Sequence, residues 1–513
     1  MLTNIYGAKC IGIEAIPVTV EVNITSGIGI HLVGLADTAV RESLLRTVTA
    51  LQSLGYRIPG RKIVINLAPA DMHKQGSGYD LPIAVGIIAA SQQEDLPGIS
   101  KYIIMGELGL DGSVRDVKGA LPISEMAHTL SLEGCILPLE SAKEAAECSS
   151  CTIYGVKSLA EVTEILKDTK SKEKYIINKR NTDYNRIQAS VYPDFADIFG
   201  QEGAKRGLEI AAAGGHNVMM IGPPGSGKST LAKALPGILP AMDHEEALQT
   251  SKIYSVAGKT VKECGLMRER PFRAPHQSSS VTAIIGGGAD NIMPGEISLA
   301  HNGILFLDEF CEMPKRIMES LRAPMEDRYV TISRLRNKVC FPASFMLVAA
   351  CNPCPCGYYG DGDRCTCSPT RREAYLSRLS GPIMDRIDIH LWMKPVETSK
   401  LIDKCVSESS AEIAKRVKSA RSIQKERFKG SGIFTNAEMS GKMTGQFCRL
   451  DNECRSFLKK TVDNLGLSAR ACHRILKIAR TIADIENSKD ICLNHLSEAS
   501  RYRFLDKRNQ DEV

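Results

Sequence analysis

The sequence has few aromatic residues and no long apolar run. Aromatics make up 5% of the 513 residues and Trp392 is the single tryptophan, a scarcity that neither supports nor excludes any fold. No apolar stretch reaches the roughly 18 residues that a membrane-spanning helix needs, so we expect no membrane contact. Met1 to Ile11 lacks the basic and apolar regions of a secretory signal. We therefore expect a reducing, cytoplasmic location, in which most of the 17 cysteines are small buried residues.

Length and net charge give a rough number of domains and a first indication of binding partners. A chain of 513 residues should hold about three domains, and 43% hydrophobic residues suffice for their cores. The net charge of +6 permits nucleic-acid binding, but an ordinary solvated surface would explain it equally well.

The strongest pattern is a glycine-rich loop between a strand and a helix. The apolar run Val218 to Ile221 precedes this loop, and helical periodicity follows it. The glycines let backbone N–H groups surround phosphate oxygens, the lysine reaches the β- and γ-phosphates, and the following serine holds Mg²⁺. This Walker A pattern predicts that ATP and Mg²⁺ bind at Gly222, Pro223, Pro224, Gly225, Ser226, Gly227, Lys228, Ser229 and Thr230.

A second apolar strand, Ile304 to Leu307, ends in Asp308 and Glu309. An apolar strand followed by two acids is weak alone, but after a complete Walker A loop it predicts a Walker B strand. We expect Asp308, with Ser229, to hold Mg²⁺, and Glu309 to polarise the attacking water.

Three further polar residues resemble the sensors and arginine finger of AAA+ ATPases. Asn352 follows the buried strand Phe345 to Ala350, at the sensor 1 position, although it would also suit a simple turn. Arg386 precedes a short strand and matches the finger that acts on a neighbouring subunit's nucleotide; a surface ion pair is the alternative. Arg470 fits sensor 2 of a helical lid, with Arg474 as the alternative.

The first part of the chain is mixed α/β and resembles the proteolytic domain of Lon-type proteases, most clearly in MGELGLDGSVRDVKGALPISEMA. Ile11 to Ile24 and Ile28 to Val33 predict strands joined as a hairpin at Ser26-Gly27. The family's Ser–Lys dyad would fall on Asp80 and Leu121, which cannot form it. We therefore expect the fold without the protease chemistry. A cryptic hydrolase remains the alternative, because Ser77 lies close to Asp80 in the sequence.

The motifs RPFRAPHQSSS, GGGADNIMPGEISLAHNGILFLDEF, NPCPCGYYG and SGPIMDRIDIH resemble magnesium-chelatase-like AAA+ ATPases of the ComM and YifB type. The resemblance implies an α/β P-loop core, a parallel sheet flanked by helices, with a helical lid and a Lon-like domain that lacks the dyad. We expect the Lon-like domain at residues 1–168, a linker at 169–191, the ATPase core at 192–394 and the lid at 395–513. A homo-hexamer with ATP between subunits is also implied.

Two segments are typical of a motor that grips a strand. The glycine-rich stretch from Gly286 to Gly295 predicts a projecting loop. Alternation through EDRYVTISRLRNKVCF predicts a hairpin with Arg334, Arg336 and Lys338 near its tip. Basic side chains there suit DNA phosphates, whereas charges that protect an edge hairpin from aggregation are the alternative.

Four cysteines form two pairs, Cys354 with Cys356 and Cys365 with Cys367, around a turn-forming loop. Four thiolates suit a structural Zn²⁺ with no open position, and free thiols or a redox-labile pair remain alternatives.

Taken together, these patterns predict an ATP-driven DNA motor: a hexameric helicase that the family resemblance connects with branch migration in homologous recombination or natural transformation. The alternatives are an ATP-driven protein remodeller or chelatase-like motor, and an ATP-dependent protease.

Overall fold

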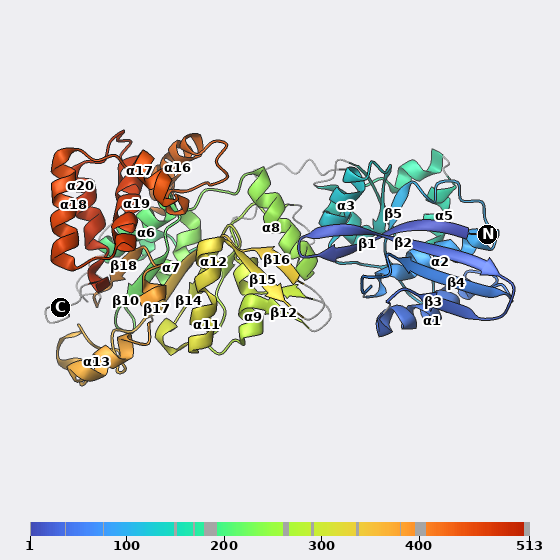
Figure 1. Cartoon of the computed structure of the whole chain (residues 1–513), viewed down its shortest axis with the longest axis horizontal. Coiled ribbons are helices and arrows are strands. Elements are labelled where there is room, and N and C mark those ends of the chain that lie inside the picture. Colours follow the sequence, from blue (N-terminus) through green and yellow to red (C-terminus); the bar gives the residue numbers. More distant parts are fainter. Residues whose placement is uncertain are drawn as a thin grey trace.

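The computed structural model describes residues 2–35, 37–74, 76–147, 151–167, 170–178, 192–259, 266–288, 292–334, 338–379, 381–395 and 407–506. Figure 1 shows an elongated molecule with one sheet at the N-terminal end, a second sheet in the middle and a helical group at the far end. Most of the expected linker at residues 169–191 lies outside the described residues, so its boundaries stay predictions.

The N-terminal sheet has seven strands in the order β3-β4-β2-β1-β5-β8-β9. The strands β1, β2 and β4 are antiparallel, whereas β1–β5, β5–β8, β8–β9 and β3–β4 are parallel pairs. The strand bounds are β1 Leu2–Ile11, β2 Glu14–Thr25, β3 Ile30–Val33, β4 Lys62–Ala68, β5 Tyr102–Ile104, β8 Gly134–Pro138 and β9 Thr152–Val156, with β6 Glu107–Leu108 and β7 Val114–Arg115 forming a separate ribbon.

The helices of this region are α1 Thr38–Ser53, α2 Asp80–Ala90, α3 Ala120–Thr129, α4 Leu139–Ala146 and α5 Leu159–Leu166. Helix α2 is apolar and almost wholly buried, because it lies against β1 and β2 inside the core. Asp37 caps α1, and its side chain accepts from the N–H of Val40 at 2.8 Å, so the helix begins at Thr38.

The predicted hairpin at Ser26-Gly27 is wrong. Strand β2 pairs with β1 through the turn at Gly12 and Ile13, and β3 pairs in parallel with β4. Alternating apolar residues identify strands but do not identify their partners, and the partner of β3 comes from further along the chain.

The central sheet has five strands, all parallel, in the order β11-β14-β17-β10-β18. The runs VMMI of β10 and ILFL of β14 are buried throughout, as expected where helices cover both faces of a parallel sheet. The bounds are β10 Val218–Ile221, β11 Phe272–Arg273, β14 Ile304–Leu307, β17 Met346–Cys351 and β18 Ile389–Trp392.

Helices and two small hairpins complete the core. The helices are α6 Glu202–Gly214, α7 Lys228–Ala234, α8 His244–Ala257, α9 Val281–Ile285, α10 Glu296–Leu299, α11 Lys315–Ser320, α12 Arg322–Asp327, α13 Pro369–Leu376 and α14 Gly381–Met384. The hairpins are β12 Gly286–Gly287 with β13 Met293–Pro294, and β15 Tyr329–Ser333 with β16 Lys338–Pro342. The α/β core with a parallel sheet flanked by helices is therefore confirmed.

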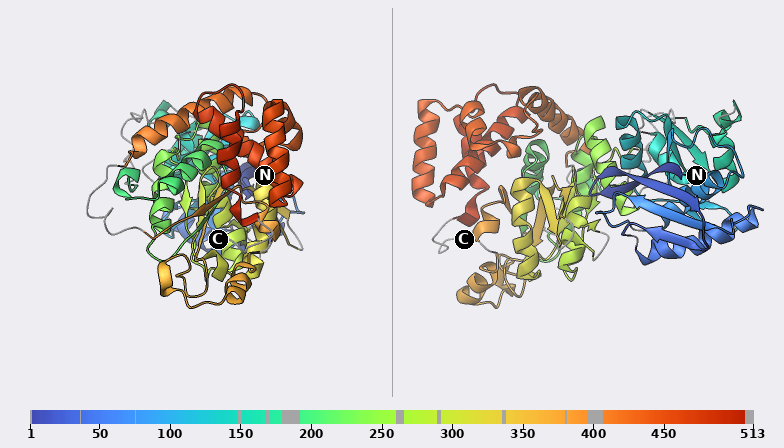
Figure 2. Two further views of the ribbon diagram at one scale, coloured as in Figure 1. Left: turned by 90° about the vertical axis from the view of Figure 1, so that its left-hand side faces the viewer. Right: turned by 45° about the vertical axis from the view of Figure 1, so that its right-hand side comes forward.

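The last part of the described chain is helical: α16 Ser410–Arg427, α17 Gly441–Phe447, α18 Asn452–Leu465, α19 Ala469–Ile485 and α20 Leu493–Arg501. These helices share one apolar cluster with a face of the central sheet. Arg421 donates to the carbonyl of Ala212 at 2.9 and 3.1 Å, and Gln424 donates to that of Ala213 at 3.1 Å. The helical region is thus fixed to α6. The right-hand view in Figure 2 shows the helical region on the side of the core away from the N-terminal sheet.

The N-terminal region contacts the core through α3, α8 and the first turn of the chain. The N–H of Gly119 donates to the carbonyl of Ser255 at 3.1 Å, and Lys252 forms a 2.5 Å ion pair with Glu125. At the turn, a Cβ on Gly12 would lie 2.8 Å from the carbonyl oxygen of Cys340 in β16. In the part of the chain that the structure describes, none of the helices has the length and apolar character to cross a bilayer.

A buried carboxylate joins the core to the helical region. Asp388, at the amino end of β18, accepts from the N–H of Asn217 at 3.0 Å and from Arg474 of α19. Nδ1 of His216 is a third neighbour, 3.5 Å from Oδ2 of Asp388. Burial opposes its charge, but Arg474, His216 and the Asn217 N–H outweigh burial and hold the pKa of Asp388 well below its usual range.

Replacing Asp388 by Asn should destabilise this junction, because it leaves the guanidinium of Arg474 without its charged partner in a largely buried position. We expect a loss of about 3 kcal/mol in the free energy of unfolding, measured by urea denaturation with far-UV circular dichroism. Asp385→Asn is the control, since the contact of Asp385 with Arg470 is long and exposed. Equal stability of both variants would contradict this interpretation.

Candidate functional site

The loop after β10 has the backbone that its glycines predict. Gly225 and Gly227 have φ angles of 76° and 88°, a region that side chains with a Cβ rarely adopt. Helix α7 begins directly afterwards at Lys228. The N–H groups of the first helical turn therefore face the same space as the loop, an arrangement that suits anionic oxygens.

Lys228 lies inside this loop and is 8% exposed. Its Nζ donates to the carbonyls of Gly222 at 2.6 Å and Pro223 at 2.9 Å, and to Oδ1 of Asn352 at 3.4 Å. Burial lowers the pKa of Lys228, whereas Cys351 and Asp308 oppose that shift. The structure therefore brings the predicted phosphate lysine and the predicted sensor into contact.

The two predicted Mg²⁺ ligands also meet. Ser229 donates from Oγ to Oδ2 of Asp308 at 2.7 Å, although the two residues follow different strands. Oδ1 of Asp308 accepts from the N–H of Glu309 at 2.9 Å. Glu309 is exposed and has a φ of 49°, a strained conformation for a residue with a Cβ. An exposed carboxylate beside a hydroxyl–carboxylate pair suits a general base next to a hydrated cation.

Arg386 lies at the opposite edge of the same sheet. It precedes the amino end of β18, whereas the Walker A loop follows the carboxyl end of the parallel strand β10. Its guanidinium forms a 2.7 Å ion pair with Glu326 and donates to the carbonyl of Pro382 at 2.6 Å. A four-residue strand is about 13 Å long, so Arg386 does not reach the nucleotide edge of its own chain.

The two predicted lid arginines lie at that same far edge. Arg470 is exposed, and its Nη1 is 3.9 Å from Oδ2 of Asp385, the neighbour of Arg386. Arg474, the alternative, is bound to the buried Asp388. Of these two arginines, Arg470 is therefore the one whose guanidinium is exposed at the surface.

The predicted basic hairpin is present as β15 and β16, with Val330, Ile332, Val339 and Phe341 inward. Arg334 and Lys338 are exposed beside its tip, whereas Arg336 lies outside the described residues. A Cβ on Gly287 of the glycine-rich hairpin would be 3.3 Å from Nη2 of Arg334. The two predicted strand-gripping segments thus lie side by side.

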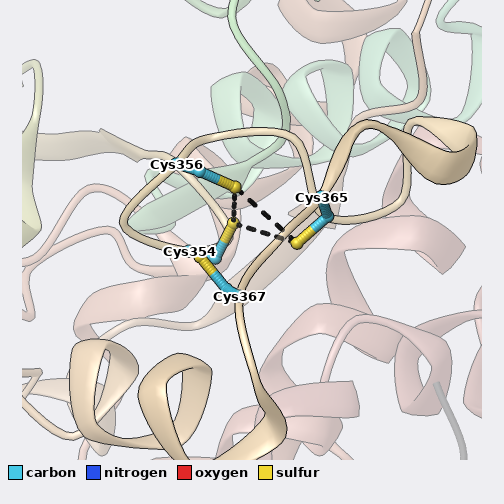
Figure 3. Close-up of side chains that lie close together, drawn as sticks. All are labelled: Cys354, Cys356, Cys365 and Cys367. Atoms are coloured by element: carbon cyan, nitrogen blue, oxygen red, sulfur yellow. Dashed lines mark hydrogen bonds between the residues drawn. The ribbon is translucent and has the colours of Figure 1, made fainter.

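The four predicted cysteine ligands converge (Figure 3). Cys354 lies 3.3 Å from Cys356 and 3.8 Å from Cys365, and Cys356 lies 3.7 Å from Cys365, all between sulfurs. The Cys367 sulfur lies within 4.8 Å of the other three. A tetrahedral Zn²⁺ with bonds of about 2.3 Å separates its sulfurs by about 3.8 Å, whereas a disulfide needs about 2.05 Å. The four sulfur atoms are therefore spaced as the ligands of a metal ion would be.

Comparison with known proteins agrees with this geometry. Residues 194–401 match the family model described as magnesium chelatase, subunit ChlI; residues 20–141 match subunit ChlI of Mg-chelatase; and residues 407–503 match its C-terminal part. YifB of Salmonella typhimurium is 42% identical over 511 residues, 99% of this chain and 98% of that protein. Competence protein ComM of Haemophilus influenzae is 40% identical over 508 residues, 98% of each chain.

The chain belongs to the YifB/ComM family of magnesium-chelatase-like proteins. A more distant relative is DNA replication licensing factor Mcm6 of Drosophila melanogaster, 25% identical over 436 residues, which are 78% of this chain and 46% of that protein. Together with the parallel sheet, these matches identify the core as an AAA+ ATPase module.

In this YifB/ComM chain, the residues at the expected protease dyad have other contacts. Asp80 is fully buried and receives two hydrogen bonds from Arg46, at 2.9 and 3.3 Å. Leu121 is buried, and its N–H donates to Ser255 at 3.4 Å. Ser77 donates to Glu107 and lines a cavity of about 360 Å³ together with Lys9 and Lys118.

Two further residues, not predicted from the sequence, support the site. Gln201 has a φ of 61° and donates from Nε2 to the carbonyls of Ser226 at 3.2 Å and Lys394 at 2.6 Å, so it connects the Walker A loop to the strand beside it. Glu326 holds Arg386. The Gly-Gln pair before α6 was a signal for Gln201, but no local pattern identifies the partner of Arg386.

Replacing Lys228 by Ala should weaken ATP binding about a hundredfold, since a charged contact to phosphate contributes up to about 3 kcal/mol. A fluorescent ATP analogue measures the dissociation constant. The matched control is Lys233→Ala, because Lys233 is exposed on the same helix, α7. Tight binding by Lys228→Ala would remove this lysine from the phosphate site.

Proposed function

We propose that the chain is an ATP-driven DNA motor that works as a homo-oligomeric ring, hexameric as its family resemblance implies, and acts on single-stranded or branched DNA. Lys228, Ser229 and Asp308 hold the nucleotide and Mg²⁺, Glu309 activates water and Asn352 senses the γ-phosphate. The observation that carries the proposal is the position of the basic hairpin. It lies in the chain between Glu309 and Asn352, the two residues expected to respond to hydrolysis.

The path from the nucleotide to the hairpin is short. Helix α12 leads into β15, and β16 leads into β17, which ends beside Asn352. Glu326, at the end of α12, also holds Arg386 at 2.7 Å. A shift of Asn352 or of Arg386 on ATP hydrolysis would thus move one end of the hairpin, and Arg334 and Lys338 would move with it. Contacts of these cations with phosphates need no base sequence.

The two edges of the sheet support the proposed ring. The Walker A loop lies at the carboxyl edge, whereas Arg386 and Arg470 lie at the amino edge. Only another copy of the chain brings these arginines to a bound nucleotide, and a ring closes such head-to-tail contacts. The relatives include competence protein ComM and DNA replication licensing factor Mcm6, and the name of the second refers to DNA.

A protein remodeller is the second candidate, and one contact favours it. The turn at Gly12 in the N-terminal region lies against Cys340 in the hairpin. A partner protein bound to the N-terminal sheet could be driven by the same hairpin movement. The response of ATP hydrolysis to DNA distinguishes the two candidates.

We also propose that Cys354, Cys356, Cys365 and Cys367 hold a structural Zn²⁺. The described sulfur separations fit a tetrahedron of thiolates, and such a site has no open position for substrate. Bound Zn²⁺ would fix a loop that has little apolar core of its own.

The trans role of Arg386 has a direct test by subunit mixing. Arg386→Ala should bind ATP but hydrolyse it at least about a hundredfold more slowly, because it loses charge stabilisation in the transition state. Glu309→Gln should bind ATP without turnover. Mixed in equal amounts, the two inactive variants should recover activity, since about one interface in four joins an intact ATP site to an intact arginine.

The recovery should appear as steady-state phosphate release that neither variant shows alone. A mixture that stays inactive although native mass spectrometry shows mixed rings would contradict the trans role.

The DNA interface is tested by ATPase and unwinding assays on single strands, forks and four-way junctions. DNA should stimulate ATP hydrolysis by the wild-type chain. In Arg334→Ala/Lys338→Ala this stimulation should be about tenfold smaller. The dependence of DNA binding on salt concentration should also be weaker, by the amount expected for the loss of about one or two phosphate contacts. The control is Lys459→Ala, which removes an exposed lysine from α18. ATP hydrolysis that responds to no form of DNA would contradict the DNA motor and favour the remodeller.

A further inference from the structure

We propose that the segment at residues 354–378, here called the cysteine lobe, positions the ATP site, so that Zn²⁺ occupancy of its four cysteines sets how fast the chain hydrolyses ATP. The inference rests on the proposed Zn²⁺ site. In Figure 1 the helix of this lobe, α13, lies at the lower edge of the molecule, away from the helical region. The lobe contacts the Walker A loop, the segment after the Walker B strand, and strand β18.

The first contact is with the Walker A loop. The lobe turns back at Gly357, which has a φ of 86°. A Cβ there would lie 3.1 Å from two ring carbons of Pro224 and 3.9 Å from Cγ of Asn352. The turn therefore touches the phosphate loop and the predicted sensor at once, and Cys354 and Cys356 are the residues that lead into it.

The second contact is with the segment after the Walker B strand. Arg378, at the far end of the lobe, forms a 2.8 Å ion pair with Glu312. The N–H of Glu312 donates to the carbonyl of Glu309 at 2.8 Å, so this pair is one turn from the proposed base. Tyr375 is 5% exposed and packs in the apolar cluster that also contains Cys311 and Cys351.

The third contact is with strand β18, which pairs with β10. A Cβ on Gly360 would lie 3.1 Å from the ring of Trp392, and the rings of Tyr359 and Trp392 meet edge to face with centroids 6.1 Å apart. The guanidinium of Arg372 lies over Tyr359, 4.0 Å from the ring centroid. The lobe is thus anchored on both sides of the Walker A strand.

Between these anchors the lobe has little structure of its own. Residues 355–368 contain one short 3-10 turn, Gly362–Arg364, and no strand. The cluster of sulfurs is what joins the start of this stretch to its end, since Cys354 and Cys365 meet at 3.8 Å. Zn²⁺ would close that loop, and its loss would let Gly357 leave Pro224 and Asn352. A displacement of about 1 Å at a catalytic group is enough to slow a reaction about a hundredfold.

The cysteines are therefore positioning residues for Asn352 and the phosphate loop. The test uses the full chain as wild type, Cys365→Ser and Cys492→Ser; Cys492 is exposed and lies outside the lobe. Zinc is measured by elemental analysis, ATP binding with a fluorescent analogue, and kcat and KM by phosphate release. Wild type and Cys492→Ser should hold one zinc with equal kinetics. Cys365→Ser should lose zinc and about tenfold or more in kcat with a smaller change in KM.

A second measurement covers a variant that fails to fold. Wild-type protein stripped of zinc by a chelator should lose kcat by the same factor, keep its far-UV circular dichroism and recover on adding Zn²⁺. Arg378→Ala should keep its zinc and still lower kcat, because it breaks the ion pair with Glu312 and the contact with the Tyr375 ring but leaves the four cysteines in place.

The outcomes separate the hypotheses. Less than about half an equivalent of zinc in reduced wild-type protein overturns the zinc site and this inference with it. Zinc that is present and removable without any effect on ATP binding or kcat overturns this inference alone. Either result leaves the DNA motor to be decided by the response of ATP hydrolysis to DNA.

Discussion

The parallel register of β14, β17 and β10 is the constraint on which the nucleotide site depends. Because the three strands are neighbours and run in one direction, the residues that follow them meet at a single edge of the sheet. The 2.7 Å contact of Ser229 with Asp308 and the 3.4 Å contact of Lys228 with Asn352 are its direct results. A one-residue shift of β14 against β17 would exchange the side chains between the two buried faces of β14 and separate these groups.

The same parallel arrangement makes one chain insufficient for the proposed reaction. Strand β18 extends the sheet in the same direction, so the residues before it collect at the opposite edge. Asp388 fixes that edge, since it binds the backbone of Asn217 and the guanidinium of Arg474. Arg470, one turn earlier on α19, is then directed past Asp385 and away from the protein interior. Burial of one arginine therefore determines the exposure of the other.

Local patterns predicted the elements of the nucleotide site well, because the Walker loops need particular residues at fixed spacing. Gly225 and Gly227 have the positive φ angles that the loop requires, and the alternation from Tyr329 to Phe341 gave the correct hairpin. Contacts between residues distant in sequence could not be predicted from these patterns. The pairing of β3 with β4, the hold of Glu326 on Arg386 and the contact of Gly357 with Pro224 all join segments whose own sequences do not specify the partner.

The N-terminal region has a mechanical consequence for the proposed motor. Its first turn reaches the core, where Gly12 approaches the backbone of Cys340 and Ile13 packs in the apolar cluster behind the hairpin. A side chain at Gly12 would collide with that backbone, so the turn limits how far β16 can move toward the N-terminal sheet. Helix α8 is held on the same side by the Ser255 and Lys252 contacts. Any movement of the hairpin during ATP hydrolysis must therefore either carry the N-terminal region with it or be directed away from that region.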